Sequence, residues 1–223
     1  GLLGGTGAIA GVVTVNGAGT IAPGLSIGTL TLDSPPVLGG TCHMEIDPNA
    51  GLPLADRIVL TGGTLVYGGA LAVSNAGAAL TGGESFKLFS APAYDGAFGE
   101  VRLPALGAGM NWHTAGLTAT GTIAVNRQPV AGELPTLTNI APAVLQIPFA
   151  WLAGSATDAD ADPLYVSSVD SASANGWPLT TDADSILYSN PASGADRFGY
   201  TIGDGRGGSA SGTVNIVSIG LPP

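Results

Sequence analysis

The chain has 223 residues, of which 36 are glycine and 16 are proline, while only 10% are charged. This composition is typical of turn-rich β proteins and argues against helical bundles, and a 45% share of hydrophobic residues argues against a disordered tail. The 6 basic and 16 acidic side chains give a net charge of −10, which repels phosphate backbones and argues against a nucleic-acid partner.

Short runs of alternating apolar and small polar residues fill residues 1–125, with Gly-Gly pairs between many of them. Runs of this length with a period of two predict β-strands. The expected strands cover residues 8–15, 19–22, 27–32, 43–46, 57–60, 64–67 and 70–73. Short strands with glycine corners predict a β-solenoid, in which each coil stacks on the next, and leave an antiparallel sandwich as the alternative.

Several of these runs resemble the passenger repeats of bacterial autotransporters. The likeness begins with Gly5-Thr6-Gly7 and Ala22-Pro23-Gly24-Leu25-Ser26-Ile27-Gly28-Thr29-Leu30. It continues through Leu38-Gly39-Gly40-Thr41 and Gly82-Gly83-Glu84-Ser85-Phe86, and it ends near Asn111-Trp112. This resemblance covers about residues 5–125, and it implies a short right-handed parallel β-helix over residues 1–125.

A polar break with a proline, Asn126-Arg127-Gln128-Pro129-Val130, suits a linker, so we predict one domain over residues 1–125 and another over 126–223. Strand-like runs in the second half cover residues 164–169, 185–188, 197–202 and 211–217. About seven short strands in a segment of this length fit an immunoglobulin-like β-sandwich.

Two segments of the second half resemble the cadherin-like repeat of large bacterial surface proteins. They are Thr157-Asp158-Ala159-Asp160-Ala161-Asp162-Pro163-Leu164 and Phe198-Gly199-Tyr200-Thr201-Ile202-Gly203-Asp204-Gly205-Arg206-Gly207-Gly208. The resemblance covers about residues 127–218 and implies a cadherin-like or immunoglobulin-like sandwich. Ala161 stands where that family has glycine in the acidic loop.

The acidic loop contains the one cluster with the spacing of metal ligands, Asp158, Asp160 and Asp162. Alternate residues of a looping segment can turn three carboxylates towards one centre, and a hard cation such as Ca²⁺ takes six to eight oxygen ligands. In a fold like that of the family, Asp204 would supply a further oxygen. The alternative is a solvated acidic loop, because aspartate is also favoured in turns.

No catalytic or cofactor-binding residues are predicted. His43 and Glu45 face the same side of an expected strand and are interpreted as a surface pair. The sequence has no G-x-S-x-G motif, and Cys42, its one cysteine, has no base beside it in the sequence. We therefore expect a protein that is not an enzyme.

The favoured function is a structural or adhesive segment of a secreted or cell-surface bacterial protein. Unpaired strands at an open N-terminal coil would allow self-association into filaments, and other surface proteins are further expected partners. The alternative is a carbohydrate-binding or carbohydrate-active module, with Trp177 as the best exposed aromatic candidate. No membrane span is expected, because Pro142 and Pro148 interrupt the longest apolar stretch.

Overall fold

The computed structural model of the chain describes residues 1–49, 54–190 and 192–220. The chain divides into two units, Gly1–Asn126 and Arg127–Pro223, and each unit has its own hydrophobic core. Strands dominate both units and the described helices are short, so the expected all-β class is confirmed.

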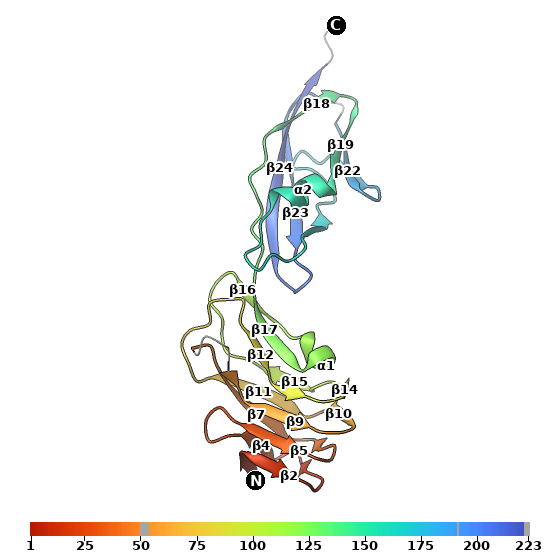
Figure 1. The fold of residues 1–223 in the computed structure, drawn as a ribbon. Coiled ribbons are helices and arrows are strands. Elements are labelled where there is room, and N and C mark those ends of the chain that lie inside the picture. The colour runs from red at the N-terminus through yellow and green to blue at the C-terminus, as the bar shows by residue number, and fades with distance from the viewer. Residues whose placement is uncertain (50–53, 191, 221–223) are drawn as a thin grey trace. The chain divides into compact units, whose positions relative to one another are not determined.

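Parallel ladders make up most of the first unit (Figure 1). The longest comprises β1 (Leu2–Gly5), β4 (Thr20–Pro23), β7 (Thr41–Asp47), β11 (Ala70–Asn75) and β15 (Glu100–Arg102), with β8 (Leu54–Ala55) antiparallel to β7. A second comprises β2 (Gly7–Ile9), β5 (Thr29–Leu32), β9 (Arg57–Leu60) and β13 (Phe89–Ser90). Two shorter ladders pair β3 (Thr14–Val15) with β6 (Val37–Leu38) and β10 (Thr64–Tyr67) with β14 (Ala93–Gly96).

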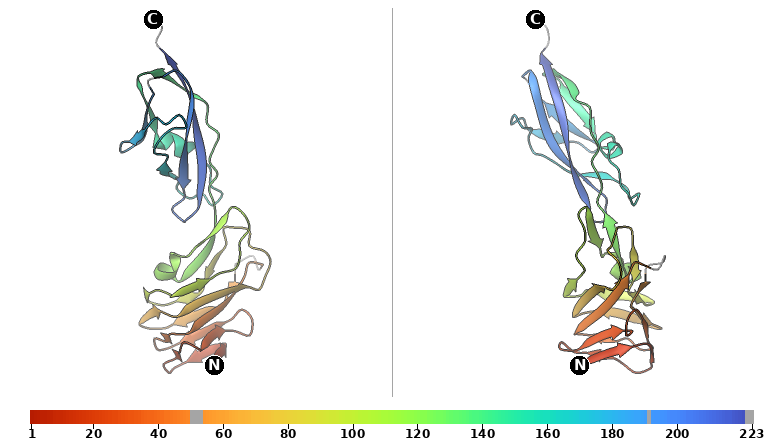
Figure 2. Two further views of the ribbon diagram at one scale, coloured as in Figure 1. Left: turned by 180° about the vertical axis from the view of Figure 1, so that it is seen from behind. Right: turned by 90° about the vertical axis from the view of Figure 1, so that its left-hand side faces the viewer.

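The chain visits these ladders in turn, so strands from successive passes lie one above the next (Figure 2). Apolar residues are in register along the stack. Ile21 pairs with Cys42 and Cys42 with Leu71, and the three are at most 1% exposed. Burial of such rows against each other is the main source of stability in this unit.

Glycine occupies corners where the stacked backbones approach closely. A Cβ atom at Gly40 would lie 2.3 Å from the carbonyl oxygens of both Asn16 and Gly19. One corner falls inside an expected strand: residues 8–15 form two strands, β2 and β3, rather than one continuous run. The chain turns between them to enter another ladder.

Beside the last strands of the parallel stack lie elements of a different kind. An antiparallel sheet contains β12 (Ser85–Lys87), β17 (Thr122–Arg127) and β16 (Met110–His113), and the short helix α1 (Gly116–Thr120) packs against β13 and β14. The hydroxyl of Tyr67 donates a hydrogen bond to the carbonyl of Leu117 in α1, at 2.8 Å. This end of the stack is therefore covered.

Two sheets form the second unit. One sheet has the order β18 (Leu137–Ala141), β24 (Ser209–Gly220), β23 (Gly194–Gly203) and β20 (Tyr165–Val169), and the other has the order β19 (Val144–Pro148), β22 (Ser185–Ser189) and β21 (Leu179–Thr181). The long β23–β24 pair runs along the unit (Figure 2). Tyr188, Phe198 and Tyr200 are at most 2% exposed in the core between the sheets.

The apolar stretch of residues 140–154 is shared among β18, β19 and the helix α2 (Phe149–Ser155). Helix α2 begins directly after Pro148 and buries Leu152. Among the described residues, no helix has both the length and the apolar character needed to cross a bilayer.

Candidate metal centre in the second unit

The acidic loop connects α2 to β20 and folds around Asp158. Its carboxylate oxygen Oδ1 accepts hydrogen bonds from the backbone N–H groups of Asp160, at 2.7 Å, and Asp162, at 3.3 Å. At the start of the loop, Thr157 exchanges two backbone hydrogen bonds with Val130. Asp158 therefore serves as the internal support of the loop, which is the usual role of aspartate in a turn.

The structure brings the three predicted aspartates together. One carboxylate oxygen from each of Asp158, Asp160 and Asp162 lies within 4.8 Å of the other two. Two Ca²⁺–oxygen bonds of about 2.4 Å span such a separation, so the spacing fits a hard cation.

Two arginines form ion pairs with this cluster. Arg127 places Nη1 2.6 Å from Oδ1 of Asp160, and its backbone N–H donates to Oδ2 of the same carboxylate at 2.7 Å. Arg206 places Nε 2.5 Å from Oδ1 of Asp162. Two positive charges thus offset part of the three negative charges of the cluster.

Two oxygens of the cluster are buried without a hydrogen-bond partner: Oδ2 of Asp158 and Oδ2 of Asp162. The Asp162 side chain is only 4% exposed. A buried carboxylate oxygen without a donor costs free energy, and a bound cation is one kind of group that satisfies such an oxygen. The donor set of this loop therefore fits a hard cation such as Ca²⁺.

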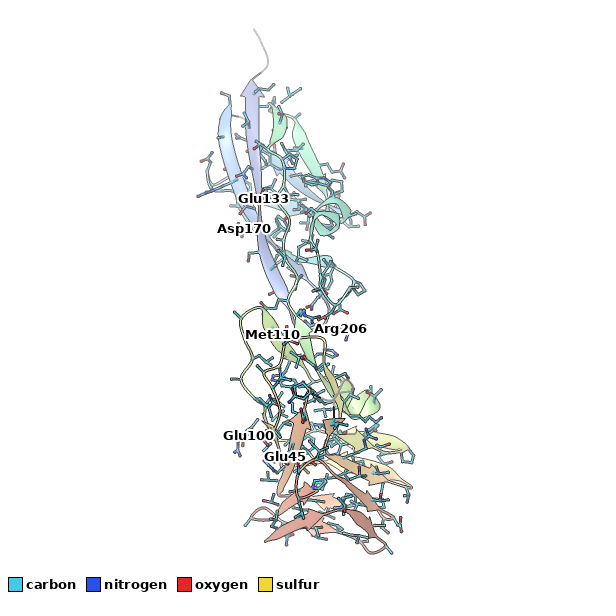
Figure 3. The ribbon with its side chains drawn as sticks, turned by 60° about the vertical axis from the view of Figure 1, so that its left-hand side comes forward. Glu45, Glu100, Met110, Glu133, Asp170 and Arg206 are labelled. Atoms are coloured by element: carbon cyan, nitrogen blue, oxygen red, sulfur yellow. The ribbon has the colours of Figure 1, made fainter. Side chains whose placement is uncertain are left out.

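Asp204 lies in the turn between β23 and β24 and has a different set of neighbours. Its Oδ1 accepts hydrogen bonds from the backbone N–H groups of Arg206, at 2.7 Å, and Gly208, at 2.9 Å. It does not belong to the group of carboxylates that converge within 4.8 Å. Asp204 fixes the turn that carries Arg206, which is labelled in Figure 3, and Arg206 connects this turn to Asp162 of the loop.

The backbone at Ala161 has φ of +60°, and Ala161 is the one described residue other than glycine with a positive φ. A side chain with a Cβ is disfavoured in this left-handed conformation. The loop therefore keeps the tight turn that glycine would permit, although alanine occupies the position.

The two arginines are the residues that sequence reasoning missed. Arg127 and Arg206 lie 33 and 44 positions from their partners Asp160 and Asp162, so local spacing cannot pair them. The sequence held one indication of their role. Residues 126–223 contain only three basic side chains, and Arg206 lies within the segment 198–208 that resembles the cadherin-like repeat.

A buried polar network elsewhere in the unit surrounds Asp196. Its Oδ2 accepts hydrogen bonds from the hydroxyls of Ser173, at 2.6 Å, and Tyr188, at 3.0 Å. Its Oδ1 accepts the backbone N–H groups of Asn175 and Arg197. Burial alone would raise the pKa of Asp196, but these hydrogen bonds together lower it.

In the first unit, His43 and Glu45 lie on the same face of β7. The His43 ring is 3.3 Å from the Ser74 hydroxyl on the neighbouring strand β11, and both His43 and Glu45 are half-buried. Asp56, which the sequence did not single out, is 1% exposed and binds the N–H groups of Gly28 and Glu45. Burial raises the pKa of Asp56.

The three tryptophans are all partly buried. Trp112 donates its indole N–H to the carbonyl of Pro104 and packs against the core of the first unit. Trp151 packs against the core of the second unit, and Trp177 is held through its backbone by Ser173. The predicted exposed ring at Trp177 is therefore partly covered.

A comparison with protein families supports the interpretation of the second half. Residues 126–217 match a family model described as a bacterial Ig domain. Bacterial Ig-like domains are typical of surface or extracellular proteins. The match agrees with the seven described strands of the second unit. No curated protein matches the chain, and no solved structure matches it. The likeness of residues 5–125 to autotransporter repeats stays a prediction.

Proposed function

We propose that the chain is a structural segment of a secreted or cell-surface bacterial protein, in which a short right-handed parallel β-helix precedes a bacterial Ig-like module. The observation that carries this proposal is that one chain contains both a stack of parallel ladders and a sandwich that matches the bacterial Ig family model. In a stack of coils each added coil lengthens the protein, and the stability is a sum over contacts between neighbouring coils. Both properties suit a spacer or a display element.

The use of the acidic side chains favours a structural role over a catalytic one. Asp56 accepts backbone N–H groups with both carboxylate oxygens, and Glu84 does the same for Thr81 and Gly82. Asp196 accepts two backbone N–H groups with Oδ1 and two hydroxyls with Oδ2. Hydrogen bonds of this kind fix loops and corners. The partial burial of all three tryptophans also weakens the carbohydrate-binding alternative.

A structural segment of this kind could act as a spacer within a longer protein or as the subunit of a filament, and we favour the spacer. Strands β1, β2 and β3 each have one described partner strand, which would suit pairing with a further coil, and an adhesive contact could use the same edge. At the opposite end, α1 packs on the last strands of the ladders, so simple head-to-tail stacking lacks a matching edge.

Negative-stain electron microscopy of the purified chain tests this choice. We expect discrete particles at all protein concentrations, with calcium present. Regular fibres would show instead that the chain is a filament subunit, and would direct further work to the edge formed by β1, β2 and β3.

We further propose Ca²⁺ as the ligand of the loop that contains Asp158, Asp160 and Asp162. The support is the convergence of three carboxylates together with two buried oxygens that lack partners. The informative variant is Asp158→Asn, because the amide can keep the two backbone hydrogen bonds at Oδ1 while an NH₂ group replaces the unpartnered Oδ2.

Thermal unfolding measured in chelator and in excess calcium tests this ligand. Calcium should raise the melting temperature of the wild-type chain, since a ligand that binds only the folded state stabilises it. Asp158→Asn should abolish the rise. An equal response of the wild type and the variant would remove the site.

A further inference from the structure

The two arginines that pair with the acidic loop differ in the exposure of their side chains and of their partners. The Arg127 side chain is 36% exposed and pairs with Asp160, whose side chain is 16% exposed. The Arg206 side chain is 48% exposed and pairs with Asp162, whose side chain is 4% exposed. Arg206 is therefore the more exposed of the two arginines, and it pairs with the more buried carboxylate.

The partner of Arg206 is in the opposite situation. The Asp162 side chain is 4% exposed, with Oδ1 paired to Arg206 and Oδ2 buried without a partner. A charge in such a place needs a counter-ion, because desolvation of an unpaired carboxylate is costly. One oxygen of the Asp162 carboxylate is thus paired with a guanidinium, and the other has no hydrogen-bond donor.

A cation bound by Asp158 and Asp162 would meet the positive charge of Arg206 at the same carboxylate. Two cations at one carboxylate repel each other, so the gain from binding the metal ion is reduced while the guanidinium stays. Binding and release of the ion are therefore coupled to the position of Arg206.

We infer that Arg206 is the resident counter-ion of the loop, so that the second unit folds without a metal ion and Ca²⁺ binds by displacing the Arg206 guanidinium from Asp162. This inference rests on the proposed calcium site. It goes beyond that site because it assigns regulation to an arginine of this chain. The turn fixed by Asp204 holds the backbone of Arg206 in place while its side chain exchanges with the ion.

The experiment is calcium titration by calorimetry on the full chain, for the wild type and Arg206→Gln. Removal of the competing charge should tighten calcium binding by about tenfold or more. In chelator, Arg206→Gln should melt at a lower temperature than the wild type, because Asp162 is then buried without a counter-ion. In excess calcium the difference in melting temperature should shrink.

Arg197→Gln is the matched control, because it removes the same charge from an exposed position in the same unit and should leave calcium affinity near that of the wild type. The double variant Arg206→Gln with Asp162→Asn guards against a folding defect. It removes both charges of the pair, so it should recover stability in chelator relative to Arg206→Gln and bind calcium more weakly.

Three outcomes would overturn the inference, and each rejects a different part of it. Equal calcium affinity in the wild type and Arg206→Gln would reject the displacement by calcium while leaving the proposed site intact. Absence of calcium binding in both proteins would reject the site itself and the inference with it. Loss of folding of the wild type in chelator would show that Arg206 does not serve as the resident counter-ion.

Discussion

Ala161 adopts a left-handed backbone conformation at the centre of the acidic loop, with φ of +60°. The conformation lets the loop turn so that the backbone N–H groups of Asp160 and Asp162 both reach Oδ1 of Asp158. An alanine is strained in this region, whereas glycine is not. Strain at one residue is thus maintained by the hydrogen bonds around Asp158.

Ala161→Gly should therefore stabilise the second unit by about 1 kcal/mol, because relief of the Cβ strain outweighs the added freedom of the unfolded chain. Urea unfolding of the full chain measures the change. Ala159→Gly is the control, since Ala159 lies in the same loop and its φ is not positive. This substitution should destabilise the second unit. The same loss of stability in both variants would contradict the argument.

Asp56 shows how one buried carboxylate connects segments of the first unit. Its two oxygens accept the N–H groups of Gly28 and Glu45, each at 2.8 Å, and it is 1% exposed. Burial raises its pKa, which indicates that the ionised form is held at some cost.

We expect Asp56→Asn to destabilise the first unit by about 2 kcal/mol, because the amide NH₂ would face a backbone N–H that needs an acceptor. Chemical denaturation followed by tryptophan fluorescence measures the loss, since Trp112 packs against this core. Asp33→Asn provides the comparison: Asp33 is exposed and accepts only the Thr61 hydroxyl among the described side chains, so its loss should be small. Similar effects of the two substitutions would refute the proposed role.

At the scale of elements, strands β22 and β23 and the loop before β21 are joined through Asp196. The carboxylate receives hydrogen bonds from Ser173, Tyr188, Asn175 and the Arg197 backbone, and these lower its pKa against the effect of burial. The folded state therefore prefers the ionised form. The stability that this preference adds is present above the unfolded pKa of 3.8 and is lost as pH falls through the lowered folded pKa.

The second unit should lose stability on acidification from about pH 5 to about pH 3, and Asp196→Asn should remove part of that pH dependence. Urea unfolding at the two pH values, for the wild type and the variant, gives the difference directly. Subtracting the change in the variant from the change in the wild type cancels the contribution of the other carboxylates. A pH dependence that is unchanged in Asp196→Asn would show that this network does not contribute.

Strand positions could be predicted from the sequence, but their pairing could not. The alternation over residues 57–60 and 64–67 matches β9 and β10 residue for residue, because one face of each strand is buried. Periodicity carries no information about which strand lies alongside, so the parallel ladders needed the structure. The short helices were also not predicted, since α1 and α2 are too short to show a helical repeat.

In the candidate metal site, too, one part could be predicted from the sequence and another part could not. Local spacing placed Asp158, Asp160 and Asp162 together, because residues so close in a loop can converge without knowledge of the fold. Arg127 reaches the loop from the end of β17, and Arg206 reaches it from the turn between β23 and β24. Their ion pairs are long-range consequences of the sandwich, so no local pattern could assign them.

At the scale of the whole molecule, two separate cores predict two modules. Leu71 and its neighbours form one core within Gly1–Asn126, and Ile202 and its neighbours form the other within Arg127–Pro223. A segment that has its own core and its own family match meets the physical requirement for folding alone.

Residues 127–223, produced without the first unit, should therefore unfold cooperatively and keep the near-ultraviolet circular dichroism expected of packed Tyr188 and Tyr200. Ile202→Ala should lower the stability of this fragment by about 3 kcal/mol, because Ile202 is 0% exposed and its truncation leaves a cavity. Val217→Ala, at a residue that is 39% exposed, should cost far less. A fragment that unfolds without cooperativity, or that responds equally to both substitutions, would show that the sandwich needs the rest of the chain to fold and would count against a modular spacer.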